Sequence, residues 1–408
     1  MSGMFKSISK LFSASIIAQG IQFSGLPLIA RLYDPEAFSL YAQINSLVSF
    51  FVVIALLQLH LAIIAEKKDK REVIQLAILS SFFVSCITLF FSVLINISYT
   101  GGNYFLSAVF SILIQFISLS NLLKGELNSK QEYNKVSFFI ITRSILCITF
   151  QILFSYLSVE NGLVIGLMLS EIIVFIAFSW SSRIWSCICI KELKTVSFFR
   201  AIKNRRDYTI FGTLQELIST ASFLLPIIMI PIVFDTNNSG QFAMIHRIMW
   251  AATVALSMAV SQVLLYRYSN ITTNLINDAI NKDFRVILLA ILVISPAVYY
   301  SIDEVVLLIL SEKWKLASDI APYLMIWCLA FLISIPYRVC YKVLLLQKKQ
   351  LLIEVLFISI ISILLFFNNM PFLQFVIHLC AVGVIQNCVI SLYAKIKISK
   401  VAKVEKIS

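Results

Sequence analysis

The sequence has 408 residues, of which 60% are hydrophobic and 13% are charged. Soluble domains carry about 25% charged residues, so this composition excludes an ordinary soluble enzyme. The formal net charge of +12 raises the question of nucleic-acid binding, which the distribution of the charges answers below. Apolar runs of about 20 residues recur along the chain, and this pattern is typical of membrane-spanning helices.

Twelve membrane-spanning helices are predicted in chain order. We expect them at 11–30, 40–64, 73–96, 104–123, 136–157, 162–180, 209–233, 241–265, 284–301, 319–341, 351–368 and 371–392. The basic, aromatic-containing segment 181–208 divides them into two groups of six and is expected to lie as an amphipathic linker on the inner membrane face. The prediction is an all-α integral membrane protein with an N-terminal lobe at 1–180, a C-terminal lobe at 209–392 and a basic cytoplasmic tail at 393–408.

The positive residues follow the predicted topology. Of the 33 lysines and arginines, 27 fall at the N-terminus, in the even-numbered loops or in the tail. The opposite side holds three (Arg31, Lys313 and Lys315), and three more lie within spans. Positive residues concentrate on the cytoplasmic side of membrane proteins, so both termini are predicted to be cytoplasmic. The net charge therefore reports topology, and we expect no nucleic-acid partner.

The first hairpin contains a charged corner. The stretch LPLIARLYDPEAFSLYAQINSLVSF, residues 26–50, interrupts an apolar sequence with Arg31, Asp34 and Glu36. A shift of 201 residues aligns Tyr-Asp at 33–34 with Phe-Asp at 234–235 without a gap. This match indicates internal duplication, and chance similarity between apolar hairpins is the alternative. Because six spans per half preserve orientation, the repeat would be parallel, with a pseudo-twofold axis along the membrane normal.

These motifs carry a family resemblance. LPLIARLYDPEAFSLYA resembles the first hairpin of the polysaccharide-exporter branch of the multidrug/oligosaccharidyl-lipid/polysaccharide (MOP) flippase superfamily, the Wzx-type O-antigen flippases. Residues 240–269, GQFAMIHRIMWAATVALSMAVSQVLLYRYS, are similar to the second-half hairpin of that branch. Residues 309–350 are similar to its later region leading into the tenth span. One departure is Ser39, which stands where the family has glycine.

The resemblance implies a flippase of the bacterial inner membrane. The expected cargo is an undecaprenyl-pyrophosphate-linked oligosaccharide, such as an O-antigen unit destined for lipopolysaccharide or a capsule repeat unit. Membrane lipids are expected partners, as are the polymerase and chain-length proteins of the same pathway. Lipid II flippases of the superfamily have fourteen spans, so they fit this chain less well.

Four arginines are candidates for binding the anionic cargo. Arginine suits phosphate because its planar fork donates two hydrogen bonds at once. Arg143, Arg247 and Arg338 lie within predicted spans, where a charge costs about 2.5–3.5 kcal/mol on insertion scales. We predict that Arg247 faces the lumen, whereas Arg143 and Arg338 have the alternatives of a snorkelling anchor and an interfacial residue. Arg31 is either part of a helix-ending corner or a cation at the exit of the path.

Other polar residues within spans have two interpretations each. Glu171 either pairs with Arg143 on the neighbouring helix or titrates as a coupling acid, and Glu216 is a second, shallower coupling candidate. The remaining group either lines a sugar path or joins helices through hydrogen bonds. Its members are Gln19, Gln22, Gln43, Asn45 and His246.

The sequence has no phosphate-binding G-x-x-x-x-G-K-[ST] motif and no nucleophile elbow. The eight cysteines are interpreted as small buried residues rather than metal ligands. No cofactor is therefore expected, and transport would be driven by a H⁺ or Na⁺ gradient, by consumption of the cargo or by a partner protein.

Two rival functions are considered. An ion-coupled multidrug/cation antiporter of the same superfamily would require an acidic cavity. Leaving aside Asp319 and Glu354 at span edges, however, the embedded set is three arginines against two glutamates. A membrane-embedded glycosyltransferase or polymerase usually needs a large external loop, and no predicted outer loop exceeds about 18 residues. The composition of the spans therefore favours an anionic cargo and a transporter.

Overall fold

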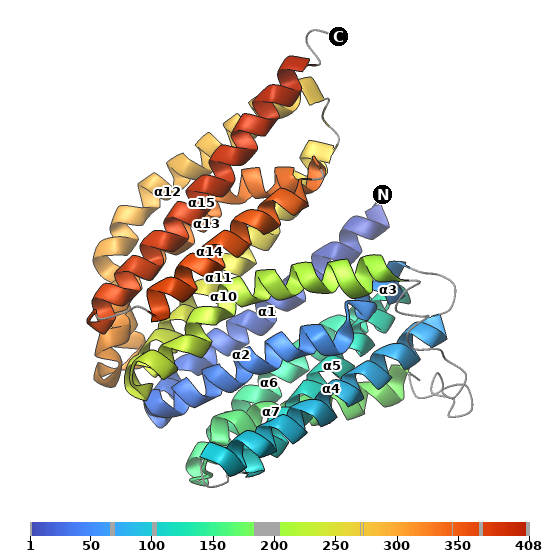
Figure 1. Cartoon of the computed structure of the whole chain (residues 1–408), viewed down its shortest axis with the longest axis vertical. Helices are drawn as coiled ribbons and strands as arrows, with labels where there is room; N and C mark the ends of the chain where they lie inside the picture. The colour runs from blue at the N-terminus through green and yellow to red at the C-terminus, as the bar shows by residue number, and fades with distance from the viewer. Residues whose placement is uncertain are drawn as a thin grey trace. The chain divides into compact units, whose positions relative to one another are not determined.

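The computed structural model describes a helical chain (Figure 1). The residues described are 2–65, 70–99, 104–182, 205–269, 271, 273–344, 346–366 and 370–404. Within these ranges no β-strand occurs, and 12 helices are long and apolar enough to cross a membrane. Helices dominate because lipid offers no hydrogen-bond partner to the backbone, so each segment must satisfy its own. The predicted all-α, multi-pass membrane fold is confirmed.

The chain divides into two compact units, and the first comprises Met1–Tyr33 and Leu40–Ala221. In this unit α1 packs on α6, α6 on α7, and α5 on both α4 and α7. The short α3 packs on α4 and α5. The elements in order are α1 (Ser2–Leu32), α2 (Pro35–Leu56), α3 (Leu59–Ala65), α4 (Lys70–Tyr99), α5 (Tyr104–Ser129), α6 (Tyr133–Tyr156), α7 (Gly162–Ser182) and the π-helix η2 (Asp207–Gly212).

The second unit comprises Asp34–Ser39 and Ser222–Ser408. Its central helix is α13, which packs on α11, α12 and α15 (Figure 1). The elements are α10 (Thr213–Val233), α11 (Thr236–Ser269), α12 (Thr273–Leu310), the 3₁₀ turn η3 (Glu312–Trp314), α13 (Lys315–Val343), α14 (Gln347–Phe366) and α15 (Phe372–Val404). The first turns of α10 and all but the first turn of α2 belong to unit 1.

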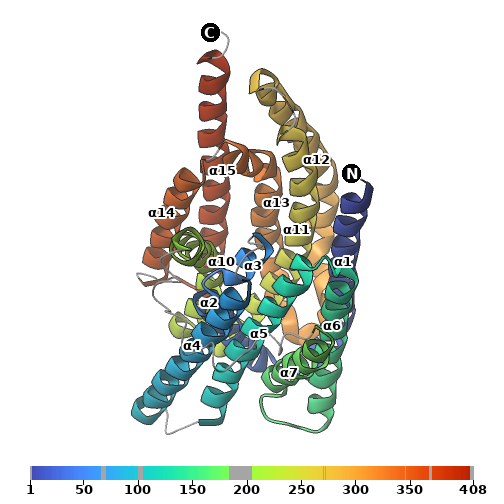
Figure 2. The ribbon, with the colours of Figure 1, turned by 90° about the vertical axis from the view of Figure 1, so that its right-hand side faces the viewer.

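The second predicted span is wrong in one respect: it is not a continuous helix over 40–64. Helix α2 ends at Leu56, and α3 begins at Leu59 as a separate short helix (Figure 2). Between them Leu57 and Gln58 have φ angles of 47° and 56°. This left-handed conformation is uncommon outside glycine and is retained where surrounding packing determines it. The sequence gives no warning, because neither glycine nor proline marks the break.

Several helices extend beyond their predicted spans. Helix α12 covers 38 residues, or about 57 Å at 1.5 Å per residue, whereas the hydrocarbon core is about 30 Å thick. At its N-terminal end Asp283 receives hydrogen bonds from Arg267 (2.5 Å) and Tyr268 (3.0 Å), which tie α11 to α12. Helix α15 runs on through most of the segment predicted as a tail. The linker predicted at 181–208 lies largely outside the described residues.

The corners of the two matched hairpins have corresponding helix ends. Helix α1 ends at Leu32 and α10 at Val233, and α2 begins at Pro35 and α11 at Thr236. Both intervals are 201 residues. The backbone N–H groups at 33 and 234 donate to the carbonyls four residues earlier in both corners (3.0 and 2.8 Å). This agreement concerns one hairpin of each half, and duplication of the whole chain stays a prediction, as do the lobe boundaries.

Candidate functional site

Unit 1 contains an ion pair between two neighbouring helices. Arg143 on α6 donates from Nε to Oε1 of Glu171 on α7. The second carboxylate oxygen of Glu171 accepts a hydrogen bond from Ser120 on α5 (3.2 Å). The Glu171 side chain is 1% exposed, and that of Arg143 is 32% exposed. The acid is therefore fully enclosed, while about a third of the Arg143 side chain is exposed.

A second cation lies in the same region. Lys124 on α5 is close enough to Arg143 and Glu171 for their charges to act on it, and its Nζ lies 5.9 Å from the centre of the Phe139 ring. Two cations and one carboxylate leave a net positive charge. In the low-dielectric interior such a charge attracts an anion more strongly than it would in water.

The amides predicted to line a sugar path are half-buried on the first two helices. Gln22 on α1 donates to Oγ of Ser144 on α6 (3.3 Å), which joins these helices. The backbone carbonyl of Asn45 accepts a hydrogen bond from Ser49 (2.7 Å). Gln19 and Gln43 occupy comparable half-buried positions. The structure thus assigns a helix-joining contact to Gln22, and the sugar path stays a prediction.

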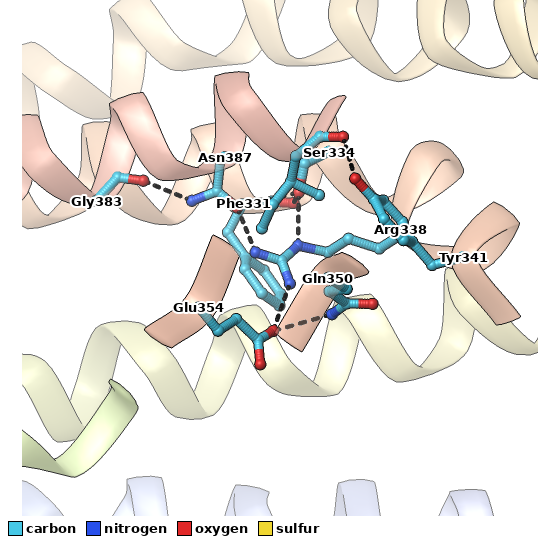
Figure 3. A network of polar contacts seen from close by, with 9 residues as sticks. Phe331, Ser334, Arg338, Tyr341, Gln350, Glu354, Gly383 and Asn387 are labelled. Carbon is cyan, nitrogen blue, oxygen red and sulfur yellow. Dashed lines mark hydrogen bonds and ion pairs between the residues drawn. The ribbon is translucent and has the colours of Figure 1, made fainter. Parts of the chain in front are cut away.

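In unit 2, Arg338 on α13 is the centre of a polar network (Figure 3). Its Nε donates to Ser334 Oγ (2.9 Å), and one terminal nitrogen donates to Asn387 Oδ1 on α15 (2.8 Å). The other terminal nitrogen lies 3.9 Å from Oε1 of Glu354 on α14, which also accepts from Gln350 (2.9 Å). Three helices therefore meet at one guanidinium.

The same guanidinium lies over an aromatic ring. Its carbon is 4.7 Å from the centre of the Phe331 ring, and the side chains of Arg338 and Glu354 are 18% and 10% exposed (Figure 3). Asn387 is oriented in turn by donating to the carbonyl of Gly383 (2.8 Å). The network is electrically neutral and largely enclosed, so it joins α13, α14 and α15 rather than presenting a free cation.

A column of aromatic rings runs through unit 2 from α11 to α13. His246 is 2% exposed, and its ring centroid lies 4.9 Å from Phe223 and 5.9 Å from Trp250. Trp250 contacts Trp327 and Phe331, both with centroids 5.3 Å away. Within the described part of the chain, the buried His246 Nε2 and Trp250 Nε1 have no hydrogen-bond partner. His246 therefore lies among aromatic rings, and its place on a sugar path stays a prediction.

Arg247 follows His246 on α11 and is half-buried. A further polar residue of the same helix, Gln241, has a structural role: it donates to the carbonyl of Lys313 (2.7 Å) and accepts from the N–H of Ala317 (3.0 Å). These bonds fix the turn that leads into α13.

Glu216 lies at the rim of a cavity in unit 1. The cavity has a volume of about 390 Å³ and is bounded by α2, α3, α5 and the first turns of α10. Glu216 is exposed, in contrast to the enclosed Glu171. Apolar side chains of α2, α3 and α5 form part of the wall. The polar lining residues are Ser49, Gln58, His60, Asn121, Glu216 and Thr220.

The corner between α1 and α2 is stabilised by charge. Lys313 Nζ lies 3.3 Å from Asp34 Oδ1, and Phe38 packs edge-on against Trp314 with centroids 5.5 Å apart. Arg31 is exposed at the end of α1. These contacts give Asp34 a structural role in the corner, whereas the role of Arg31 as a contact for cargo stays a prediction.

Apart from the pairing of Arg143 with Glu171, which was one of two alternatives, the sequence did not indicate the partners of the interior cations. Lys124 and Glu354 occur at predicted span ends, where charge is common and carries no signal. Asn387 and Ser334 are single polar residues in apolar runs. A pairing of Arg338 with residues 49 and 16 positions away needs the tertiary fold.

Comparison with known proteins identifies the family of the chain. The sequence model of the family described as polysaccharide biosynthesis protein matches residues 28–319, which is more than half of the chain. The chain belongs to this family. No curated protein matches the sequence.

Solved structures of MOP transporters share the fold. An inward-facing multidrug resistance MATE family transporter of the MOP superfamily aligns over 96% of both chains, with a TM-score of 0.70 and 14% identity. A MOP superfamily transporter from Pyrococcus furiosus, described as having reversed binding-pocket polarity, aligns over 97% of this chain and 96% of that chain (TM-score 0.62, 13% identity). MATE in complex with MaL6 aligns over 98% and 97% (TM-score 0.64, 13% identity).

The family match and the fold agree with each other. The resemblance to the polysaccharide branch of the MOP superfamily, carried by the first and second-half hairpins, is confirmed. The shared fold also agrees with the twelve candidate spans.

Proposed function

We propose that this protein is a flippase for an undecaprenyl-pyrophosphate-linked oligosaccharide. It moves an O-antigen or capsule repeat unit from the cytoplasmic to the periplasmic leaflet of a bacterial inner membrane by alternating access. Both termini are cytoplasmic in this proposal, as the distribution of lysine and arginine indicates. The observation that carries the proposal is the match of residues 28–319 to the polysaccharide biosynthesis family in a chain with the MOP fold.

The interior charges support an anionic cargo. Arg143 and Lys124 outnumber Glu171 in unit 1, and Arg143 is partly exposed. Arg247 in unit 2 is a candidate phosphate contact in its own right, because its guanidinium can donate two hydrogen bonds to one phosphate. The protein positions and carries the cargo without changing its covalent structure, so it is proposed to be a transporter and not an enzyme.

Coupling to a H⁺ or Na⁺ gradient is part of the proposal. Glu171 is the first candidate for the coupling acid, because it pairs with Arg143 and lies near Lys124. The pair thus offers a direct link between an acid and an anion site. Glu216, in its separate cavity, is the second candidate.

The test is surface display of glycan in a host whose chromosomal copy is deleted. The Arg247→Ala variant should block display while the protein inserts at its normal level, because a phosphate contact is lost. Arg285→Ala removes an exposed arginine of α12 and serves as the matched control, which should restore display. Full display by Arg247→Ala would remove Arg247 from the site. Loss of drug resistance with unchanged glycan after deletion would instead indicate a cation antiporter, and unpolymerised units on the outer face would indicate a polymerase.

A further inference from the structure

The break between α2 and α3 forms one side of the polar cavity in unit 1. Leu56 from the end of α2, Gln58 from the break and His60 from α3 all line it. Breaks of this kind in transporters are tolerated where the freed backbone groups face protein or a cavity, and substrate or ion sites are often built there. The position of the break therefore marks this cavity as a candidate ligand site.

The break is fixed by contacts from two neighbouring helices. Ser80 on α4 donates to the carbonyl of Ala55 in the last turn of α2 (2.6 Å). On α5, Gly125 lets the backbone of α3 approach so closely that an added Cβ would lie 2.7 Å from the carbonyl oxygen of His60. A side chain at position 125 would displace α3. The cavity is thus a built feature of unit 1.

We infer that this cavity binds one neutral sugar ring of the oligosaccharide cargo. The inference rests on the proposed function and adds a glycan subsite that is separate from the arginines proposed for the pyrophosphate. Its lining combines a carboxylate, two amides, an imidazole and two hydroxyls with apolar side chains. Sugar rings present hydroxyl groups that donate and accept at once, together with apolar C–H faces, so this mixture complements them.

The size of the cavity favours a sugar over a bare ion. Pockets for small ligands measure about 300–1,000 Å³, and this cavity of about 390 Å³ falls within that range. A Na⁺ or Ca²⁺ ion needs several oxygen ligands at about 2.3–2.6 Å. A cavity of this size is too wide to hold its lining oxygens at that distance around one ion. Among the described residues, no group of three or more His, Cys, Asp and Glu is arranged to hold a metal ion.

The buried nitrogen of His60 points to a missing partner. His60 Nδ1 is buried and has no hydrogen-bond partner among the described residues. A buried polar atom without a partner costs about 1–3 kcal/mol, so such atoms commonly mark sites completed by water or a ligand. A sugar hydroxyl would reach this nitrogen only if the His60 ring turned toward the cavity, and it would then serve either tautomer, because a hydroxyl both donates and accepts.

Glu216 sets the charge preference of the site. Its carboxylate accepts hydrogen bonds from two neighbouring hydroxyls of a ring, and it repels an acidic sugar. The site should therefore prefer glucose, galactose or N-acetylglucosamine over glucuronate. Glu216 and Asn121 are the specificity-determining residues of this arrangement, since they contribute a charge and an amide from different helices.

The experiment is ligand-observed saturation-transfer NMR on the full chain in nanodiscs. The probes are glucose, galactose, N-acetylglucosamine and glucuronate, offered singly. The wild-type chain should give signal from at least one neutral sugar and little from glucuronate. Glu216→Gln should lower affinity for the neutral sugar by about tenfold, since hydrogen bonds to a charged group contribute on this scale, and should reduce the discrimination against glucuronate.

Two further variants keep the test independent of folding. Asn121→Leu keeps the branched shape and the number of side-chain heavy atoms but removes the amide, and it should also weaken the neutral-sugar signal. Glu160→Gln removes an exposed acid outside the cavity and should match the wild type. Absence of signal from every neutral sugar with the wild type overturns the inference, as does an unchanged signal in both Glu216→Gln and Asn121→Leu. A chain that displays glycan in cells without binding free sugars refutes only the subsite, whereas one that binds sugars without display refutes the proposed function.

Discussion

Each unit holds an arginine within a candidate membrane span that pairs with a glutamate on a neighbouring helix, and the two pairs differ. In unit 2, Arg338 reaches Ser334, Asn387 and Glu354 and lies over a phenylalanine ring. In unit 1, Arg143 shares Glu171 with the nearby Lys124 and is 32% exposed. The first arrangement neutralises its cation, and the second leaves positive charge in excess.

The difference distinguishes an arginine with a structural role from an arginine that is a candidate for binding the cargo. Both arginines interrupt apolar runs, so both were predicted from the sequence as candidate phosphate contacts. Their surroundings show that Arg338 has its donors occupied by three helices, while Arg143 retains accessible surface. The role of an interior charge therefore depends on the residues that surround it, and these contacts distinguish a structural charge from a binding site.

The largest effect is expected for Arg338→Ala. Removing the guanidinium leaves Glu354 as an enclosed charge and deprives Asn387 and Ser334 of a partner, which costs about 3–5 kcal/mol for a broken buried pair. The melting temperature of the purified protein in detergent should fall accordingly. It can be measured by size-exclusion chromatography after heating to a series of temperatures. The double variant Arg338→Ala/Glu354→Gln removes the unpaired charge and should recover part of the loss. An unchanged melting temperature in the single variant would remove the structural role.

The Arg143 pair should respond in both stability and transport. Glu171→Gln leaves two cations without their acid and should cost about 3 kcal/mol, at the lower end for a broken pair because Arg143 is partly exposed. Arg143→Gln/Glu171→Gln should regain stability but not glycan display, because the guanidinium group that would bind phosphate is absent. Display by this double variant at the wild-type level would show that Arg143 is structural, like Arg338.

A smaller effect tests the packing beside Lys124. Gly125→Ala places a methyl group against the carbonyl of His60 and should destabilise by about 1–3 kcal/mol, as overpacking does. Gly20→Ala is the matched control, because an added Cβ there meets nothing within 4 Å. In a helix that substitution should instead stabilise by about 0.5–1 kcal/mol. Equal melting temperatures for the two variants would contradict the close approach of α3 and α5.

The smallest effects concern the two hairpin corners, where equivalent aspartates have different partners. Asp235 accepts from the N–H and the side-chain amide of Asn238 (2.6 and 2.9 Å) and caps α11. Asp235→Ala should cost about 1 kcal/mol at any salt concentration. Asp34→Ala loses an exposed ion pair with Lys313 and should cost less than about 1 kcal/mol, with the effect vanishing in high salt. Thermal unfolding at low and high ionic strength distinguishes them.

The sequence predicted the twelve spans because each is a long apolar run that must satisfy its backbone within itself. It did not predict the break at Leu57 and Gln58, since their left-handed conformation depends on packing by α4 and α5 rather than on residue type. The contact between Arg143 and Glu171 was one of two alternatives, because adjacent spans often pair.

The contacts of Arg338 with α14 and α15 were beyond reach, since residue spacing does not reveal which helices pack together. The cavity beside Glu216 likewise arises from four separate helices. The aromatic contacts of His246 were not predicted for a related reason: Phe242 and Trp250 lie on its own helix, but the contact with Phe223 on α10 depends on how the two helices pack.

The buried aromatic residues also determine what intrinsic fluorescence can report about this protein. Of the five tryptophans, Trp250, Trp314 and Trp327 are buried in unit 2, whereas Trp180 in unit 1 is 80% exposed. Buried indoles shift and lose their emission when the packing around them opens. The emission of these three buried tryptophans during denaturation should therefore follow the loss of unit 2, while circular dichroism follows the helices of both units. A difference between the two signals would give the order in which the units unfold without any added label.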